Sequence, residues 1–562
     1  MISAFTGTQV REAEQPLLDS GEGAVLMQRA AHGLAAAVVR ELQRRGRRIY
    51  GSAVTVLAGK GNNGGDGLFA AAKLASRGMR TTAVLTADAA HPEALAAFLS
   101  AGGRAHRLAP ENAEELAVLT AGDDAIIDSV LGTGARGGLR GAAAELVSLL
   151  QELRPALVVA CDIPSGVDAD TGEVHWPVLP ADVTVTFGGI KAGLLADPGE
   201  EYAGRVELVR IGIEHRLPAA SLLRLEAPDL TALVPSPGRR DHKYSRGVLG
   251  VVAGSERYPG AAVLSVQSAS ATGAGMVRYL GPGSVARHVL ARTPEAVVEE
   301  GSPGRVQAWL LGPGIPDPEP GEPDGDEQLR RVRDTLEAAR AAGQPVVVDA
   351  GALGVLPARC PAHWILTPHA GELAAFLSRR HTARGEAAVT RDDVGSRPLH
   401  FARLAATDSG ATVLLKGATT LVASPSGAVF SQSEGTPWLA TAGSGDVLAG
   451  LLGSLAAQYA ETAMDDDGPF AALGIAPEDR WAAAAAVAAS LHGRAGSRAS
   501  DGGPLTARAL LRELPERWPA WGTGTRSRSV SMTGRDPIRH AAVLLWHIAA
   551  PPRAGGGTLS AT

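Results

Sequence analysis

The segment GSGD at residues 443–446 combines residue types that can bind a phosphate and move a proton. It stands directly before an apolar stretch, residues 447–455, that predicts a helix. Free amide groups at a helix start favour an anion such as a phosphoryl group. The Asp446 carboxylate would lie beside that anion, where it could accept a hydroxyl proton during phosphoryl transfer. The alternative for Asp446 is a plain helix N-cap.

A second glycine-rich segment, GKGNNGGDG at residues 59–67, follows an apolar run, Ala53–Ala58, that predicts a buried strand. The glycines let the backbone approach a ligand closely, and the helix predicted at Gly67–Ser76 would offer amides to a phosphate. The segment contains the spacing G-x-G-x-x-G, which with Asp88 resembles a dinucleotide-binding fingerprint. A tight turn without a ligand is the alternative for so short a match.

Amide and carboxylate side chains follow three of the predicted strands, in segments 62–66, 128–134 (DSVLGTG) and 162–172 (DIPSGVDADTG). The carboxyl ends of parallel strands meet at one edge of a sheet, where such folds bind ligands. Oxygen-bearing side chains of these kinds can hold a hard cation. The residues expected to converge are Asn63, Asp128, Asp162 and Ser165. For either aspartate alone, a cap of a helix or turn is the alternative.

Further polar segments follow predicted strands in the second half of the chain. KGATT at residues 416–420 forms a plausible nucleotide-contacting turn, and TPHAGE at 367–372 places His369 at another strand end. A lone histidine at that position could equally be structural. GPG at 312–314 offers another close backbone approach.

Short apolar strands alternate with helical stretches twice along the chain, which predicts two α/β units with parallel sheets covered on both faces. Between them, residues 212–241 contain four prolines that interrupt the pattern. The predicted organisation is a domain at residues 1–220, a linker at 221–240, a domain at 241–521 and a disordered tail at 522–562.

The amino-acid composition of the chain argues against several classes of protein. The 562 residues carry a formal net charge of −6, which argues against a nucleic-acid-binding protein. The two cysteines cannot build a disulfide framework, which favours a reducing compartment. We see neither a signal peptide nor an apolar run long enough to span a membrane. Lysine is rare among the 53 basic residues, and four of the five lysines lie beside glycine-rich or polar motifs.

The motifs of the first half resemble the NAD(P)H-hydrate epimerase family: LMQRAA, GKGNNGGDG, DSVLGTG, ACDIPSGVDADTG and TVTFGGIKAG, over most of residues 1–215. The resemblance implies a Rossmann-like domain that exchanges the R and S hydrates, with Asp162 contacting the nicotinamide ring and serving as acid/base. It implies a bound potassium ion with ligands Asn63, Asp128 and Ser165. The implied substrate-binding residues are Asn62, Asn63, Gly64, Gly65, Asp66, Gly132, Thr133, Gly134, Ala135, Arg136, Gly137 and Gly138.

The motifs of the second half resemble the ribokinase-like superfamily, and within it the ADP-dependent NAD(P)H-hydrate dehydratase family: HKYSRGVLGVVAGS, YPGAA, LLGPG, VVVDA, LTPHAGE, KGATT and ATAGSGDVLAG. The match spans about 236–520. It implies that Ala262, Gly314, His369 and Asp446 face the hydrate, with Asp446 catalytic. It implies that ADP or ATP, with Mg²⁺, contacts Lys416, Gly417, Ala418, Thr419, Thr420 and Gly445. Two positions depart from the family: Gly351 stands where an acid is expected, and Ala370 where a proline is expected.

Fused epimerase–dehydratase chains are a known bacterial arrangement in these families. The sequence therefore predicts a cytoplasmic, bifunctional enzyme that epimerises NAD(P)HX and dehydrates the S form, acting on small molecules and self-associating as its relatives do. The first alternative is a ribokinase-like kinase for a small alcohol or vitamin precursor, fused to a nucleotide-binding domain. The second is a binding module without catalysis, against which the intact Asp162 and Asp446 argue. The motifs do not indicate whether the enzyme prefers ADP or ATP.

Overall fold

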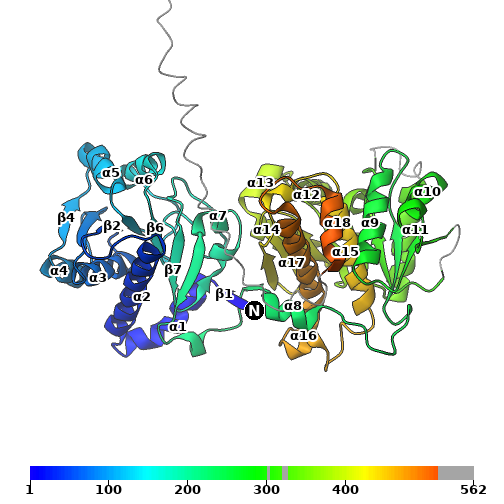
Figure 1. The fold of residues 1–562 in the computed structure, drawn as a ribbon, viewed down its shortest axis with the longest axis horizontal. Helices are drawn as coiled ribbons and strands as arrows, with labels where there is room; N and C mark the ends of the chain where they lie inside the picture. Colours follow the sequence, from blue (N-terminus) through cyan, green and yellow to red (C-terminus); the bar gives the residue numbers. More distant parts are fainter. Residues whose placement is uncertain (300–303, 319–326, 517–562) are drawn as a thin grey trace, which may run out of the picture.

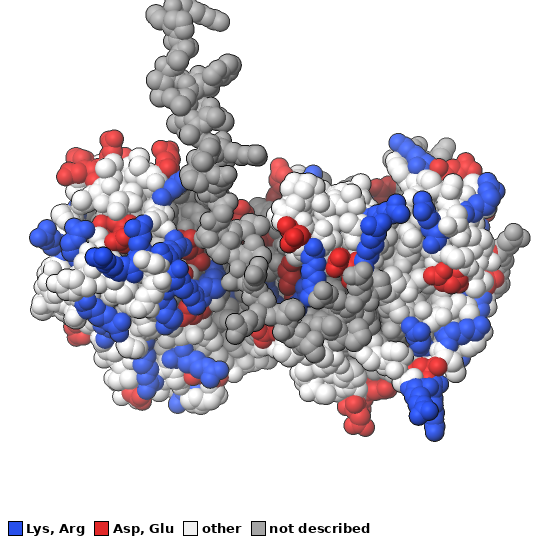
Figure 2. Space-filling view, in the orientation of Figure 1, with Lys and Arg blue, Asp and Glu red and all other residues white. Residues whose placement is uncertain are grey.

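Two β-sheets, each covered by helices, organise the chain into two lobes that lie side by side (Figure 1). This computed structural model describes residues 1–299, 304–318 and 327–516. The tail predicted at 522–562 lies outside the described residues. On the face shown in Figure 2, basic and acidic side chains are interspersed over both lobes.

The first lobe is built on a seven-stranded sheet in which every pairing is parallel. Its strands, in spatial order, are β4 (Arg104–Arg107), β3 (Arg80–Leu85), β2 (Ala53–Ala58), β5 (Ala125–Ser129), β6 (Val158–Cys161), β7 (Val183–Phe187) and β9 (Arg205–Val209). The helices of this lobe are α1 (Gly7–Asp19), α2 (Gly23–Arg44), α3 (Asn62–Ala75), α4 (Pro92–Ser100), α5 (Ala113–Ala121), α6 (Gly141–Leu153) and α7 (Gly199–Ala203).

Alternating side chains of this sheet enter two separate cores. Val54 and Val56 pack with α2 and α3 on one face, while Leu57 packs with α5 and α6 on the other. Both faces are thus buried, and β2 is apolar throughout, as is typical of a parallel sheet in an α/β protein.

The second lobe is built on a twelve-stranded sheet. Its strands, in spatial order, are β13 (Val297–Val298), β12 (Met276–Tyr279), β11 (Val248–Val252), β14 (Ala308–Leu311), β15 (Val346–Val348), β16 (Trp364–Leu366), β17 (Thr412–Leu415), β18 (Thr420–Ala423), β19 (Val429–Gln432), β10 (Leu222–Arg224), β1 (Ile2–Phe5) and β8 (Ile190–Lys191). The run from β13 to β17 is parallel, and β18 and β19 add an antiparallel hairpin.

Helices cover both faces of this sheet as well. One core contains α9, α15 and α17, and the other contains α11, α12 and α14. The helices of the lobe are α8 (Ala227–Leu233), α9 (Pro259–Ala271), α10 (Gly283–Arg292), α11 (Glu327–Ala342), α12 (Ala370–Arg384), α13 (Arg391–Ser396), α14 (Pro398–Ser409), α15 (Ser444–Tyr459), α16 (Pro469–Ala472), α17 (Arg480–Ser500) and α18 (Ala507–Glu516). The predicted α/β class with two three-layer units is confirmed.

Three strands from the first part of the chain extend the sheet of the second lobe. β10 pairs with β19, β1 pairs with β10, and β8 pairs with β1. Residues 221–240, which the sequence analysis assigns to a linker, therefore contain a strand and a helix, and Leu230 and Leu233 are buried in the second core. The two lobes share a hydrogen-bonded sheet instead of meeting through a flexible connection.

Within residues 1–299, 304–318 and 327–516, no helix combines the length and apolar character needed to cross a membrane.

Candidate active sites

The loops after β2, β5, β6 and β7 lie on one edge of the seven-stranded sheet, because these strands are parallel neighbours. The loop after β2 differs from expectation, because α3 begins at Asn62 and not at Gly67. Residues 62–66 are thus the first turn of a helix, where amides are free for an anion. A Cβ on Gly64 would lie 2.0 Å from the Gly59 carbonyl oxygen, so only glycine fits there.

Asp128, Ser165 and Asn63 meet around the loop that follows β5. The Asp128 carboxylate accepts hydrogen bonds from the Ser165 amide at 2.8 Å and hydroxyl at 2.6 Å. The Ser165 hydroxyl accepts from the Leu131 amide at 2.8 Å, and the Asn63 side-chain amide donates to the Leu131 carbonyl at 3.0 Å. Burial raises the pKa of Asp128, which is 1% exposed. Of the three predicted cation ligands, Asp128 and Ser165 are thus in direct contact, and Asn63 is joined to Ser165 through Leu131.

Asp162 lies in the left-handed region, with φ +69°, directly after β6. This backbone is unusual for a non-glycine residue and is found at strained functional positions. One carboxylate oxygen, Oδ1, accepts hydrogen bonds from the Thr186 hydroxyl and the Phe187 amide, both at 3.1 Å, and from the Lys191 ammonium. Among the described residues, the other oxygen, Oδ2, accepts no hydrogen bond.

Lys191 is the main residue of this site that the sequence analysis did not assign. Its side chain is 1% exposed, and its ammonium also donates to the Thr186 hydroxyl at 3.1 Å and the Phe187 carbonyl at 2.9 Å. A buried ammonium group is costly unless it is paired with an opposite charge, and Asp162 is that partner for Lys191. Two features of the sequence could have indicated a functional role for Lys191: lysine is rare among the basic residues, and Lys191 lies in the GGIKAG motif.

Two further carboxyl groups feel the charges of the Asp162–Lys191 pair. Burial raises the pKa of Asp66 well above its usual range, and the carboxylates of Asp162 and Glu14 raise it further. Burial likewise raises the pKa of Glu14, on α1, against the lowering effect of Lys191. The site thus contains one charge-paired carboxylate and two carboxyl groups whose pKa values are raised. Glu14 was not predicted, because nothing in its local sequence marks it.

The glycine-rich loop at 132–138 is partly exposed and is contacted by α1. The Arg11 guanidinium donates to the Thr133 carbonyl at 2.7 Å. A Cβ on Gly132 would lie 3.0 Å from the Asn63 side chain, and one on Gly138 would lie 2.8 Å from the His175 carbonyl oxygen. The loop therefore packs closely against Asn63 at its start and against His175 at its end.

The second site lies at the carboxyl ends of β15, β16 and β17, opposite the start of α15. The Lys416 ammonium lies 2.9 Å from an Asp349 oxygen and 3.7 Å from a Glu372 oxygen. Burial alone would lower the pKa of Lys416, but these two carboxylates outweigh it and the net pKa is raised. A Cβ on Gly445 would lie 3.6 Å from the same ammonium. The cation therefore stands beside the helix start predicted to bind phosphate.

Asp446 occupies the first turn of α15, after Gly443 with φ +88°. In the part of the chain that the structure describes, no side chain or amide donates to its carboxylate, so it is not the plain N-cap. Burial raises the pKa of Asp446 to about 7, with Asp349 and Glu372 raising it and Lys416 lowering it. This value suits a group that exchanges a proton near neutral pH.

The other predicted hydrate-facing residues differ in exposure. The His369 side chain is 60% exposed and caps α12, its Nδ1 accepting from the Gly371 and Glu372 amides at 3.0 and 3.2 Å. Ala262 is fully buried in the core, so its side chain offers no surface to a ligand. A Cβ on Gly314 would lie 2.6 Å from that of Ala261, which accounts for the glycine.

The turn at 416–420 is divided between solvent and the first lobe. Gly417 and Ala418 are exposed, whereas Thr419 is 4% exposed. The Thr419 amide donates to Asp197 at 2.7 Å and its hydroxyl donates to Glu200 at 2.6 Å. The tip of the turn is thus the part open to a nucleotide, and the Thr419 hydroxyl is already engaged.

The departure at Gly351 has a steric cause. A Cβ there would lie 2.2 Å from the Pro316 carbonyl oxygen and 2.3 Å from that of Ile315. An acid at this position has no room. Asp349, two residues earlier, is the buried carboxylate that faces Lys416.

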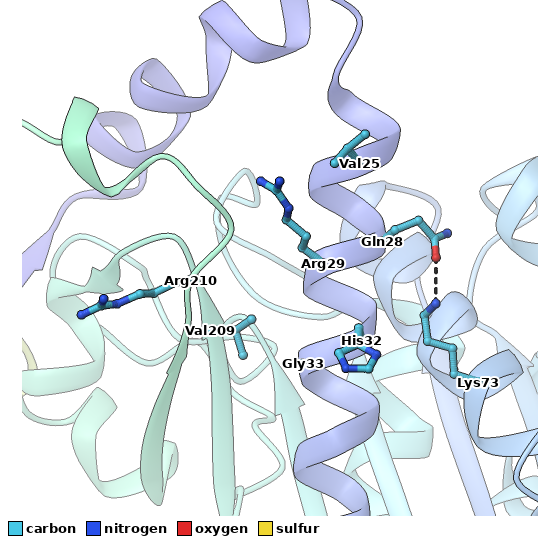
Figure 3. A pocket seen from close by; sticks show the side chains of 8 residues that line it. All are labelled: Val25, Gln28, Arg29, His32, Gly33, Lys73, Val209 and Arg210. Carbon is cyan, nitrogen blue, oxygen red and sulfur yellow. Dashed lines mark hydrogen bonds between the residues drawn. The ribbon is translucent and has the colours of Figure 1, made fainter.

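A surface cavity of about 460 Å³ lies elsewhere on the first lobe, against α2 and β9 (Figure 3). Its lining residues are Val25, Gln28, Arg29, His32, Gly33, Lys73, Val209 and Arg210. None of the predicted site residues is among them.

The fold is that of a two-domain α/β protein, with the buried Asp162–Lys191 pair at a strand edge of the first domain and the Asp446 carboxyl group in the first turn of α15 in the second. Residues 23–193 match the family described as YjeF-related protein N-terminus, and residues 249–515 match the family described as NAD(P)H-hydrate dehydratase. The chain belongs to the bifunctional NAD(P)H-hydrate repair enzymes.

Two relatives and one solved structure illustrate the similarity. The bifunctional NAD(P)H-hydrate repair enzyme Nnr of Mycobacterium tuberculosis is 42% identical over 458 residues, covering 80% of this chain and 88% of the relative. The NAD(P)H-hydrate epimerase of Microbacterium testaceum is 43% identical over 244 residues, covering 43% of this chain and 90% of the relative. The ADP/ATP-dependent NAD(P)H-hydrate dehydratase of Bacillus subtilis, co-crystallized with ATP/Mg²⁺, is 24% identical with a TM-score of 0.42, covering 53% of this chain and 98% of that one.

Proposed function

We propose that Asp446 and Asp162 divide the repair of hydrated NAD(P)H between them, Asp446 serving dehydration and Asp162 serving epimerisation. The chain is a bifunctional NAD(P)H-hydrate epimerase and ADP/ATP-dependent dehydratase. The observation that carries the proposal for the dehydratase is the Asp446 carboxyl group in the first turn of α15, whose pKa of about 7 suits proton exchange. For the epimerase it is the buried Asp162–Lys191 pair.

In the dehydratase, the amides that begin α15 and the Lys416 ammonium hold the phosphates of ADP. Asp446 accepts the proton of the C6 hydroxyl as that oxygen takes the terminal phosphoryl group and AMP leaves. The C6–O bond then breaks, the phosphate departs with the bonding electrons, and a proton is lost from C5. The C5–C6 double bond that forms restores the reduced nicotinamide ring, and ADP has become AMP and phosphate.

In the epimerase, exchange of R and S hydrates requires a bond at C6 to break and re-form, with a proton given and taken back. Three donors meet Asp162 Oδ1, which leaves Oδ2 to exchange that proton. Lys191 pairs with Asp162, the proposed base of the site. Asp66, whose pKa is raised by burial, is the neighbouring group that can carry a proton. A pair of carboxyl groups with different environments is a common arrangement for acid–base work.

A potassium ion fits the group formed by Asn63, Asp128 and Ser165. The Asp128 carboxylate is buried, and the donors that reach it are the Ser165 amide and hydroxyl and the Val130 amide, all neutral. A monovalent cation would balance that charge and order the loop at 132–138, which packs against Asn63.

Mg²⁺ is proposed to enter with the nucleotide. Among the described residues, no group of three or more His, Cys, Asp or Glu side chains is arranged to hold a metal. Mg²⁺ usually binds through one or two carboxylates together with substrate phosphates, and Asp446 lies in the helix turn that we propose binds the phosphates. The ion would offset phosphate charge there.

A cytoplasmic location fits the two cysteines, Cys161 and Cys360, which are both free and buried.

The test is recovery of reduced nicotinamide absorbance when the purified chain is incubated with ADP and chemically hydrated NADH. We expect recovery with ADP and none without it. The alternative, a small-alcohol kinase, would show nucleotide turnover only when a sugar or vitamin-precursor alcohol is added, with the hydrate left unchanged.

A further inference from the structure

Two carboxylates of the first domain reach into the nucleotide turn of the second. The Thr419 amide donates to Asp197 Oδ2 at 2.7 Å, and the Thr419 hydroxyl donates to Glu200 Oε2 at 2.6 Å. Asp197 and Glu200 follow the GGIKAG motif of the first domain, more than 200 positions before Thr419 in the sequence. Neither was singled out from the sequence.

Glu200 is held rigidly by further contacts. The Arg224 guanidinium donates to both of its oxygens at 2.7 Å, and the Ser433 hydroxyl donates to Oε1 at 2.8 Å. Burial raises the pKa of Glu200, but the Arg224 charge and the hydrogen bonds from Arg224, Thr419 and Ser433 together outweigh it, and the net pKa is lowered. Glu200 is therefore an ionised acceptor with four donors, joining β10, the hairpin β18–β19 and its own helix α7. Two-pronged contacts of this kind fix geometry as well as charge.

The carboxylates belong to a short segment that begins in the epimerase site. Lys191, which pairs with Asp162, is the last residue of β8, and β8 pairs with β1 at the end of the second sheet. Asp197 lies six residues later, and α7 lies at the junction of the two lobes (Figure 1). One segment, residues 190–203, therefore contacts Asp162 at one end and Thr419 at the other.

We propose that Asp197 and Glu200 are positioning residues for the nucleotide turn at 416–420, so that the epimerase domain completes the nucleotide site of the dehydratase. This rests on the proposed function, in which the turn contacts ADP. Thr419 is buried, so its amide and hydroxyl would lose their only described acceptors if the carboxylates were removed, at the cost of unpaired buried donors. The exposed tip, Gly417 and Ala418, would then no longer be fixed relative to the nucleotide.

The experiment uses the full chain with Asp197→Ala and, separately, Thr419→Val, which keeps the shape of the side chain but removes its hydroxyl. Exposed Glu201→Ala, in α7 beside Glu200, is the matched control. We expect the KM for ADP in dehydration to rise between about fivefold and about a hundredfold in the first two variants. The kcat should stay within about twofold, and the epimerase rate should not change. Glu201→Ala should behave as the wild type.

Thr419→Ser restores the hydroxyl and should bring the KM for ADP back towards the wild-type value, which a merely structural effect of altering the turn would not do. An unchanged KM for ADP in both Asp197→Ala and Thr419→Val would overturn the inference. An equal loss of both activities would also overturn it, because that would indicate a general structural role. If the wild type itself showed no ADP-dependent dehydration, the proposed function would fail, and this result is distinct from the other two.

Discussion

The Lys416 ammonium lies 2.9 Å from the Asp349 carboxylate, and this pair stands beside Asp446 in the first turn of α15. Three carboxyl groups, those of Asp349, Glu372 and Asp446, thus share one cation. Like charges that compete for one cation cannot all be equally stable as anions. Asp446, which accepts no hydrogen bond from the described residues, is the one with the pKa of about 7.

The first prediction concerns the pH dependence of dehydration. Asp446 must be deprotonated to accept the hydroxyl proton, so kcat/KM should rise as the pH rises through about 7. Lys416 lowers the pKa of Asp446, so Lys416→Met should move this rise to higher pH as well as weaken nucleotide binding. The measurement is the pH profile of kcat/KM for both proteins. Identical midpoints would show that Lys416 does not act on the titrating group.

The second prediction concerns the buried pair in the epimerase site. Lys191→Met leaves the Asp162 carboxylate buried without its cation, and we expect unfolding free energy to fall by about 3–5 kcal/mol. The double variant Asp162→Asn, Lys191→Met removes both charges and should regain most of that loss, while epimerase activity stays absent. Urea unfolding followed by circular dichroism measures the first effect. A double variant as unstable as Lys191→Met would indicate that charge is not the cause.

The third prediction concerns potassium. Asp128→Asn keeps the shape of the buried side chain but removes the negative charge that a cation would balance. We expect epimerase activity to depend on K⁺ in the wild type and to become low and insensitive to K⁺ in the variant. Rates in potassium and tetramethylammonium salts make the comparison, with the fully exposed Asp88→Asn as control. Equal rates in both salts for the wild type would argue against a potassium site.

The fourth prediction concerns the family position occupied by Gly351. Gly351→Asp would place a Cβ 2.2 Å from the Pro316 carbonyl oxygen, so we expect a loss of about 1–3 kcal/mol of stability and no gain in dehydration. Gly395→Ala, in α13, is the control because no other part of the described chain lies within 4 Å of its Cβ position, apart from its neighbours in the same helix. Thermal unfolding compares the two. A stable, more active Gly351→Asp protein would contradict the steric explanation.

The sequence predicts best the parts of the fold that are local. The apolar run Ala53–Ala58 coincides with β2, and the glycine-rich motifs lie at strand ends as expected. The strands β1, β8 and β10 were not predicted, because each has only two to four residues and is stabilised by partners far along the chain. No local pattern marks such strands, and of the three only β10 lies within residues 221–240, which the sequence analysis assigns to a linker.

The same distinction holds within the sites. Asp446 and Asp162 lie in glycine-rich or strand-end motifs, so a few neighbouring residues are enough to predict a functional role for them. Glu14 and Asp349 act through groups that lie far from them in sequence, with Glu14 reaching the charges of Asp162 and Lys191 from α1. The contribution of Glu14 and Asp349 to the sites depends on tertiary packing, which a local sequence motif does not predict.

The most direct test of the division of labour uses Asp446→Asn and Asp162→Asn separately, on a mixture of R and S hydrates with ADP. We predict that Asp446→Asn still interconverts the isomers but restores no reduced nicotinamide absorbance. Asp162→Asn should convert the S portion at the wild-type rate and then stop, leaving the R portion unchanged. Loss of both activities in each variant, or full conversion of the mixture by Asp162→Asn at the wild-type rate, would contradict this account.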